Sequence, residues 1–340
     1  MRRIRTLSHT SIQDFLTCPR KFEWRRVCRL RKRRRAQALR LGDRYHQGLD
    51  LLKKGESLEA VVLHVWETYR EIPPQVLDQE AWLVEREICI RLLCAWDFFT
   101  EPLDVVASEV SFEARIRNPE TGHATGRFRY RGILDGIVRL VDGRLGVLEQ
   151  KTTSQSIEPH SDYIRRLRVD SQISRYLLAA QDAGISASAV IYDITRKPSI
   201  KPRRLTKKEV KTLETEGTYF DQPIEFIPSD DLRRETPEMF GARLNDHICR
   251  QHERYFLRLE IPRLQQDLDE EARELWFQQQ AIARAVRTGH FFRTTSACLS
   301  PYRCEFADLC LSGITPAGLE PGEVPDGYRL SRSTPKEKQT

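Results

Sequence analysis

Residues 129–153, RYRGILDGIVRLVDGRLGVLEQKTT, form the stretch that decides the fold. Two runs rich in Ile, Leu and Val, residues 131–141 and 144–151, flank the dipeptide Asp142-Gly143. Aspartate followed by glycine favours a tight turn between paired strands. The sequence therefore predicts a β-hairpin.

Charged residues occur inside this hairpin. Asp135 and Glu149 lie within the two runs, although acidic residues are poor strand formers. A carboxylate inside a strand needs a partner, and a divalent cation is a common one. Lys151 lies two residues after Glu149 and so points to the same face of the strand. We expect one pocket with two carboxylates and an ammonium group. Ordinary polar strand positions joined by a surface salt bridge are the alternative.

Strands and helices alternate around the hairpin. Residues 104–117 alternate like a strand, and 118–127 read as a loop because they contain Asn-Pro and Thr-Gly. After the hairpin come a polar loop at 154–163, a helix at 165–183 and a strand at 187–194. The order strand, hairpin, helix, strand indicates an α/β fold with a mixed sheet.

Helical spacing of apolar residues dominates the remaining segments. A Ser/Thr cluster at residue 8 is suited to capping a first helix, and Pro19 to beginning a second. Further segments are predicted as helices at 38–54, across 57–101 with a break at Pro73-Pro74, at 238–250 and at 264–288, with a strand at 253–261.

Three of the eight cysteines are evenly spaced. Cys298, Cys304 and Cys310 are separated by five residues each, in a short polar and aromatic stretch that is unlike a core segment. Thiolates are soft ligands that suit an iron–sulfur cluster or zinc. Cys89 and Cys94 lie inside a predicted helix and are expected to be buried thiols.

Composition narrows the class of protein. Of the 340 residues, 39% are hydrophobic and 31% charged, with 56 Lys and Arg against 49 Asp and Glu. The pI is about 9.0, and arginine suits phosphate binding, so a polyanionic partner is favoured. No apolar run reaches membrane-spanning length and no signal region precedes residue 12, so we expect a cytoplasmic protein of prokaryotic or phage type without membrane association. Cysteines in that compartment are more often thiols or metal ligands than disulfides.

Residues 25–35 are densely basic. Such a run is either a solvated surface segment or an arm that contacts phosphates, and the sequence leaves both open. No Gly-x-x-x-x-Gly-Lys-(Ser/Thr) phosphate loop is present, so a fused helicase motor is not expected. Residues 314–340 combine Pro, Gly and charges, which predicts a disordered tail.

Several motifs together resemble the PD-(D/E)XK nuclease superfamily, in particular its RecB-like and CRISPR-associated branch with an iron–sulfur cluster. They are Ser11-x-x-x-Phe15-x-x-Cys18-Pro-Arg-Lys-Phe22, Gly42-x-x-x-His46, Gly132-x-x-Asp135, Glu149-x-Lys151 and Gln172-x-x-x-Tyr176. The resemblance spans about residues 7–312. It implies a restriction-endonuclease-like αβα core with a mixed sheet, a helical N-terminal cover and a C-terminal cysteine cluster. One nuclease domain is expected over residues 1–313, with a helical insertion at about 57–101.

The resemblance also implies a metal site. Asp135 and Glu149 would hold one or two Mg²⁺ or Mn²⁺ ions, with the backbone carbonyl of Gln150 as a further ligand. His46 would lie beside the metal, where imidazole completes a carboxylate shell or binds a water. A lone histidine on a helix is otherwise an ordinary polar or core residue.

Further site residues follow from the same motifs. Lys151 would orient the attacking water or neutralise the phosphorane. Gln172 and Tyr176 are four residues apart, hence on one helical face, and would position the DNA strand. Glu109 helps to build the active site in some family members, whereas an exposed strand glutamate is the alternative here.

For the cysteines, the resemblance adds Cys18 as the first ligand of a [4Fe–4S] cluster completed by Cys298, Cys304 and Cys310. The gap between Cys298 and Cys304 is longer than in the family pattern Cys-x-x-Cys-x5-Cys. Zinc is the alternative metal, and a buried small side chain is the alternative for Cys18.

The function expected from the sequence is a metal-dependent DNA nuclease, with an exonuclease favoured. Its context would be DNA repair, recombination, or phage or CRISPR-type DNA processing, with single strands or duplex ends as substrate and a helicase or recombination protein as a partner. A non-cutting DNA-end-binding or adaptor protein is the first alternative. A zinc-stabilised scaffold without nucleic acid is the second.

Overall fold

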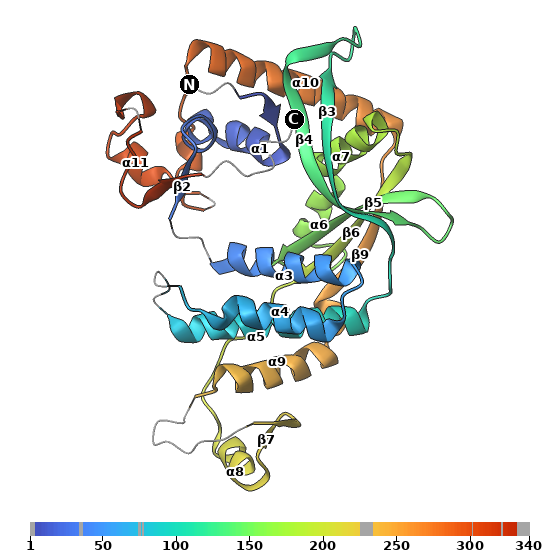
Figure 1. Ribbon diagram of the computed structural model, residues 1–340, viewed down its shortest axis with the longest axis vertical. Helices are drawn as coiled ribbons and strands as arrows, with labels where there is room; N and C mark the ends of the chain where they lie inside the picture. The colour runs from blue at the N-terminus through green and yellow to red at the C-terminus, as the bar shows by residue number, and fades with distance from the viewer. Residues whose placement is uncertain are drawn as a thin grey trace.

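A six-stranded mixed sheet forms the centre of the computed structural model (Figure 1), which describes residues 4–33, 37–73, 76, 78–224, 234–300, 302–320 and 322–331. The strands are β1 (Thr6–Leu7), β3 (Asp104–Arg117), β4 (Ala124–Arg139), β5 (Leu145–Thr153), β6 (Ala187–Arg196) and β9 (Phe256–Pro262). β4 pairs antiparallel with β3 and β5 and parallel with β1. β5 and β6 are parallel, and β9 closes the far edge antiparallel to β6.

The predicted hairpin is confirmed as β4 and β5. Gly143 adopts φ +86°, a left-handed conformation that glycine enters without steric cost, and this turns the chain. The loop predicted at 118–127 is too long, because β4 already begins at Ala124. Phe128 and Tyr130 are buried there while their neighbours are exposed, so alternate burial holds this early part of the strand against the core.

Helices cover both faces of the sheet, as the predicted αβα core requires. On one side, α1 (His9–Thr17), α7 (Ser171–Asp182) and α10 (Gln265–Thr288) bury their apolar stripes against the strands in a shared core. On the other, α3 (Gln37–Lys53), α4 (Leu58–Arg70), α5 (Gln79–Phe99) and α9 (Pro237–Arg250) share a second core. The indole N–H of Trp96 in α5 donates to Asp193 of β6 at 2.9 Å, which ties this helical layer to the sheet.

The predicted helix at 165–183 is wrong as a single element. It is divided into α6 (Asp162–Arg168) and α7, because the side chain of Asp170 accepts a hydrogen bond of 2.8 Å from the backbone N–H of Gln172 and begins a new helix. Gln172 and Tyr176 therefore lie on the second helix after β5. The cap places Gln172 in the first turn of α7.

The N-terminal helices begin where the sequence predicts. Ser8 caps α1, and Pro19 is the first residue of α2 (Pro19–Phe22), which continues into a π-helical turn, η1 (Glu23–Val27). Within the predicted basic run, Arg25 and Arg26 both pair with the buried carboxylate of Asp14, at 2.6 and 2.8 Å. These two arginines therefore stabilise the N-terminal fold, while Arg34 and Arg35 lie outside the described residues.

The prediction of a disordered tail from residue 314 is wrong up to residue 331. β10 (Tyr328–Leu330) pairs antiparallel with β2 (Leu30–Lys32). Tyr328 is buried, stacks on Phe306 with ring centres 5.8 Å apart, and so anchors a segment whose composition otherwise suggests disorder. Residues 332–340 lie outside the described part of the chain.

The other elements are α8 (Lys207–Glu216), β7 (Thr218–Tyr219), β8 (Gln222–Pro223), η2 (His252–Arg254), η3 (Thr295–Ala297), α11 (Ala307–Leu311) and η4 (Pro316–Gly318). No helix among the described residues is long and apolar enough to cross a membrane.

Candidate active site

Asp135 lies at the point where β4 and β5 stop pairing. The ladder between them runs from Arg139 and Leu145 to Gly136 and Leu148, and Asp135 is the next residue of β4. In place of a ladder bond, the backbone N–H of Gln150 donates 2.7 Å to Oδ2 of Asp135. The carboxylate of Asp135 thus holds β4 and β5 together where their pairing ends.

The predicted site residues of β5 and α7 form one hydrogen-bonded group. Lys151 Nζ lies 2.6 Å from Oε1 of Glu149 and donates 2.8 Å to Oε1 of Gln172. The amide nitrogen of Gln172 donates 2.8 Å to Oε1 of Glu149 and 2.9 Å to the hydroxyl of Tyr176. Gln172 therefore holds the side chains of both Glu149 and Lys151 in fixed positions.

Burial changes the acidity of this group. It raises the pKa of Glu149 to about 7; the ammonium of Lys151 opposes the shift and the carboxylate of Asp135 adds to it. Burial acts to lower the pKa of Lys151, but the neighbouring carboxylate of Glu149 outweighs it and the pKa is raised. Glu149 is therefore poised to exchange a proton for a cation near neutral pH, while Lys151 stays charged.

Gly132 of the Gly-x-x-Asp motif makes room for this arrangement. A Cβ atom at this position would lie 2.6 Å from Cζ of Phe112 and 3.2 Å from Cε1 of Tyr176. The rings of Phe112 and Tyr176 meet edge to face, 5.6 Å between centres. A glycine on β4 thus leaves room for both rings, and Tyr176 packs closely against the strand that carries Asp135.

His46 reaches the site from α3, on the other side of the sheet. Burial lowers the pKa of His46; the Asp135 carboxylate opposes this, and the ammonium groups of Lys151 and Lys53 add to it. The imidazole therefore favours its neutral form, which is the form that binds a metal. The structure brings His46 to the group predicted from the motifs, and its role beside a metal stays a prediction.

Sequence reasoning missed Lys53. Its Nζ donates 2.7 Å to the backbone carbonyl of Asp135, and its side chain is only 4% exposed. Lys53 lies seven residues after His46, two turns along the same face of α3. That helical spacing was the available signal.

Two more residues near the site were missed. Asp170 caps α7, accepts a 3.2 Å hydrogen bond from the hydroxyl of Tyr192, and its charge acts on both Glu149 and Lys151. Burial lowers the pKa of His9 in α1 to about 4, with Asp170 opposing the shift. An Asp two residues before Gln172 is an N-cap signal, whereas nothing in the sequence pointed to His9.

Within the described part of the chain, Glu109 is linked to this group only through Lys53, whose pKa its charge acts to raise. Its side chain is 55% exposed and pairs with Lys54 at 3.6 Å. Its backbone has φ +48°, a strained value for a residue with a Cβ.

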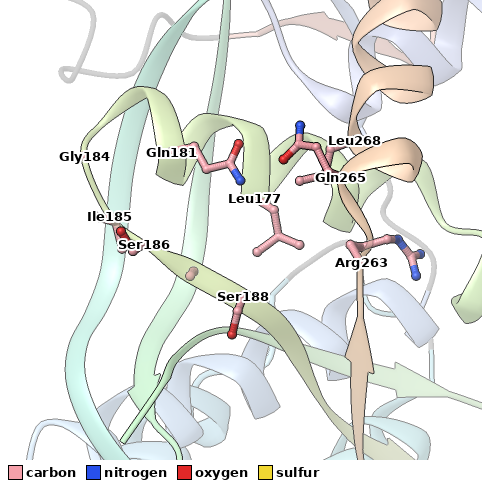
Figure 2. A pocket seen from close by; sticks show the side chains of 10 residues that line it. Leu177, Gln181, Gly184, Ile185, Ser186, Ser188, Arg263, Gln265 and Leu268 are labelled. Carbon is pink, nitrogen blue, oxygen red and sulfur yellow. The ribbon is translucent and has the colours of Figure 1, made fainter.

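A hollow beside α7 is also separate from the site. A pocket of about 430 Å³ lies at the C-terminal end of α7. Figure 2 shows the residues that line it, which include Gln181, Arg263 and Leu268. None of the predicted site residues contributes to it. The candidate site is therefore not this pocket. It is the place where β4 and β5 separate, with Asp135, Glu149 and Lys151, which is called the seam below.

The donor set at the seam suits a hard divalent cation. Carboxylate and carbonyl oxygens are the ligands that Mg²⁺ and Mn²⁺ prefer. Across the described residues, however, no three His, Cys, Asp or Glu side chains lie close enough together to surround a metal ion. Glu149 instead pairs with Lys151, and Asp135 accepts from the backbone N–H of Gln150.

The predicted cysteine ligands come from both ends of the chain to one region. The backbone N–H of Thr294 donates to Sγ of Cys18 at 3.4 Å, and the backbone N–H of Cys304 donates 2.8 Å to the carbonyl of Cys298. Burial raises the pKa of Cys304 and Cys310, and the charge at Cys18 raises both further. The thiols are near enough for their charges to act on one another. Among the described residues, however, no three of them lie close enough together to surround a metal ion.

Groups around these thiols can donate to sulfur. The indole nitrogen of Trp24 is buried with no hydrogen-bond partner among the described residues, and its N–H lies by Cys310, where it opposes the rise in the thiol pKa. The backbone N–H of Phe306 acts on Cys304 in the same direction. Such donors suit a thiolate-bound metal, whose sulfurs carry negative charge.

Comparison with known proteins agrees with the motifs. A family model described as the PD-(D/E)XK nuclease superfamily matches residues 6–311, well over half of the chain. No curated protein matches the sequence. The matched region contains the hairpin with Asp135, Glu149 and Lys151, and Gln172 of α7. The chain therefore belongs to the PD-(D/E)XK nuclease superfamily.

Proposed function

We propose that this protein is a metal-dependent DNA nuclease that hydrolyses phosphodiester bonds at the seam between β4 and β5. One observation supports this most: Asp135, Glu149 and Lys151 lie on adjacent strands and are each held by a hydrogen bond. Asp135 accepts from the backbone N–H of Gln150, Glu149 accepts from the amide of Gln172, and Lys151 donates to its carbonyl oxygen. Membership of the superfamily implies the same class of reaction.

The carboxylates of Asp135 and Glu149, with the Gln150 carbonyl and His46 nearby, would hold Mg²⁺ or Mn²⁺. A divalent cation there supplies Lewis acidity and lowers the pKa of a bound water. Opening the Glu149–Lys151 pair frees the carboxylate, and the ammonium group of Lys151 then stabilises charge on the phosphate. Gln172 keeps Lys151 aimed at the seam, because its Oε1 accepts from Nζ at 2.8 Å.

The finer assignment is a RecB-like exonuclease that acts in DNA repair, recombination or phage or CRISPR-type processing, alongside a helicase or recombination protein. The RecB-like spacing of Gly42-x-x-x-His46 and Gln172-x-x-x-Tyr176 supports this branch. The hydrogen bond from Gln172 to Tyr176 gives the second motif a structural basis.

Cleavage of DNA labelled at either end tests the function. Single-stranded and duplex substrates are incubated with Mg²⁺ or Mn²⁺ and wild-type protein, Lys151→Ala, or the control Lys208→Ala on the exposed face of α8. We expect the wild type and the control to cut and Lys151→Ala to lose most of the activity, and the ladder of products then gives the polarity. DNA binding without cleavage by the wild type would instead favour a non-cutting end-binding protein.

We also propose that Cys18, Cys298, Cys304 and Cys310 hold a [4Fe–4S] cluster, with zinc as the alternative. Their convergence from both chain ends and the N–H groups of Thr294 and Trp24 beside the sulfurs support a thiolate-bound metal. The cluster would join α2 to the C-terminal segment and be structural, since hydrolysis needs no electron transfer.

Anaerobic purification followed by metal analysis and visible absorption tests this. Cys18→Ser should lose iron, the absorption and thermal stability, whereas the matched control Cys249→Ser, at an exposed cysteine of α9, should keep all three. Stoichiometric zinc in a colourless protein would replace the iron–sulfur assignment, and metal-free wild type would reject both.

A further inference from the structure

The outward face of β4 carries a row of arginines. Arg127, Arg129 and Arg131 are exposed, while Phe128 and Tyr130 between them are buried in the core. Because alternate residues of a strand share a face, the three guanidinium groups start from one side of the sheet at steps of roughly 6.6 Å.

The row leads to the candidate active site. The same alternation continues through Ile133, which is exposed, to Asp135. Asp135 lies four residue steps of extended strand after Arg131, about 13 Å along the chain. A polymer lying along the arginines therefore arrives at the catalytic seam.

The neighbouring strand widens the basic face. In the β3–β4 ladder, Arg115 is opposite Arg129 and Glu113 is opposite Arg131. Glu113 is an acid on this surface, and Asp182 lies at its margin, where it pairs with Arg117 at 3.6 Å. Arginines outnumber acids along the ribbon, so the face is positive overall.

Structural roles do not account for Arg127 and Arg129. At Arg129, β4 has the strand neighbours β3 and β1 on its two sides, so a charge is not needed there to protect an edge from pairing with another chain. Among the described residues, Arg127 and Arg129 have no ion-pair partner. The guanidinium of Arg127 lies 5.7 Å from the ring centre of Phe128, and the residue is exposed.

We propose that the outward face of the β3–β4 ribbon binds the phosphate backbone of the DNA strand that is cut, and guides it to Asp135. This inference rests on the proposed nuclease function and adds the path of the substrate. A row of positive charges favours a negatively charged polymer as the ligand. Planar guanidinium groups in addition bind phosphate oxygens in bidentate fashion, so the phosphate backbone of DNA fits this face. The acidic seam repels phosphates, so cations beside it are needed to hold the strand there.

Salt-dependent binding in EDTA tests the proposal without any requirement for cleavage. Fluorescence anisotropy of a labelled single-stranded oligonucleotide is followed from about 50 to about 200 mM salt for the wild type and for R127Q/R129Q/R131Q. The control is K207Q/K208Q/K211Q on α8, which removes the same charge from exposed positions far from the ribbon (Figure 1). R127K/R129K/R131K tests whether charge alone is sufficient.

Loss of three phosphate contacts should reduce the slope of log Kobs against log salt by about 2 and weaken binding roughly 100-fold near 100 mM salt. The α8 control should change neither, and the lysine variant should recover most of the affinity. Equal binding by the β4 and α8 variants would overturn the substrate path while the nuclease function stands. No DNA binding by the wild type would overturn the path and the DNA substrate together.

Discussion

The backbone N–H of Gln150 donates a 2.7 Å hydrogen bond to Oδ2 of Asp135. It connects β4 to β5 just beyond their last ladder pair, Gly136 and Leu148. An acidic residue that is expected to bind a cation is therefore also a structural partner of the strand that carries Glu149 and Lys151. A substitution of Asp135 is therefore expected to affect both cation binding and the position of β5.

Two substitutions separate these roles. Asp135→Asn keeps an oxygen for the Gln150 N–H but removes the charge, so we expect near wild-type stability and no cleavage. Asp135→Ala leaves the N–H without its acceptor and should lower the free energy of unfolding by about 1–3 kcal/mol as well. Urea unfolding in EDTA measures the difference, and equal stability of the two variants would contradict the structural role.

Gly132→Ala should disturb the site through packing. The added Cβ would lie 2.6 Å from Phe112 and 3.2 Å from Tyr176, and relieving this overlap should cost about 1–3 kcal/mol. At Gly126 of the same strand, an added Cβ would meet no atom within 4 Å, so Gly126→Ala should change stability by less than about 0.5 kcal/mol. Thermal unfolding of the pair checks this, and similar losses at both glycines would refute the packing explanation.

Gln172→Glu should impair catalysis without unfolding the protein. The new carboxylate still accepts from Lys151 but no longer donates to Glu149 or Tyr176, and it repels Glu149. Supporting residues of this kind typically change activity or metal affinity by about 10–100-fold. Cleavage rates across a Mn²⁺ titration measure both effects. Gln181→Ala, at the exposed far end of α7, serves as the control, and wild-type titration curves for Gln172→Glu would remove Gln172 from the site.

Local patterns accounted for the elements that position the site. The turn at Asp142-Gly143, the alternation in β3 and the apolar stripe of α10 each depend on residues adjacent in sequence, and each appears where predicted. The break between α6 and α7 was missed because neither glycine nor proline marks it. Only the Asp170 cap does, and it competes with continuous helical spacing across 165–183.

Contacts between distant segments were beyond the sequence. Lys53 reaches the carbonyl of Asp135 across 82 positions, and its helical spacing fits an ordinary surface lysine equally well. The order of residues 322–331 depends on the pairing of β10 with β2 and on the stacking of Tyr328 against Phe306, and overall composition shows neither contact. The motifs located Glu149 and Lys151, whereas the bridge that Gln172 makes between them depends on how α7 packs against β5.

The raised pKa of Glu149 predicts how stability depends on pH. An ordinary glutamate titrates near pH 4.5, and burial raises the pKa of Glu149 in the fold to about 7. Below pH 4.5 the group is neutral in both folded and unfolded states and has no effect. As pH rises from 4.5 to 7, only the unfolded chain ionises, so the metal-free protein progressively loses stability, and above pH 7 the loss is constant.

The size of this loss follows from the shift, at about 1.4 kcal/mol for each pH unit, and is on the order of 3 kcal/mol. We expect the stability difference between Glu149→Gln and wild type in EDTA to grow by that amount from pH 4.5 to 7. Urea unfolding at several pH values measures it, with Glu113→Gln on the exposed face of β3 as a control that should show no such trend. Adding Mn²⁺ should reverse the loss for the wild type alone, since the cation takes the place of the proton on Glu149. A parallel pH profile for Glu149→Gln and wild type would show that this carboxyl titrates normally and is not poised for metal binding.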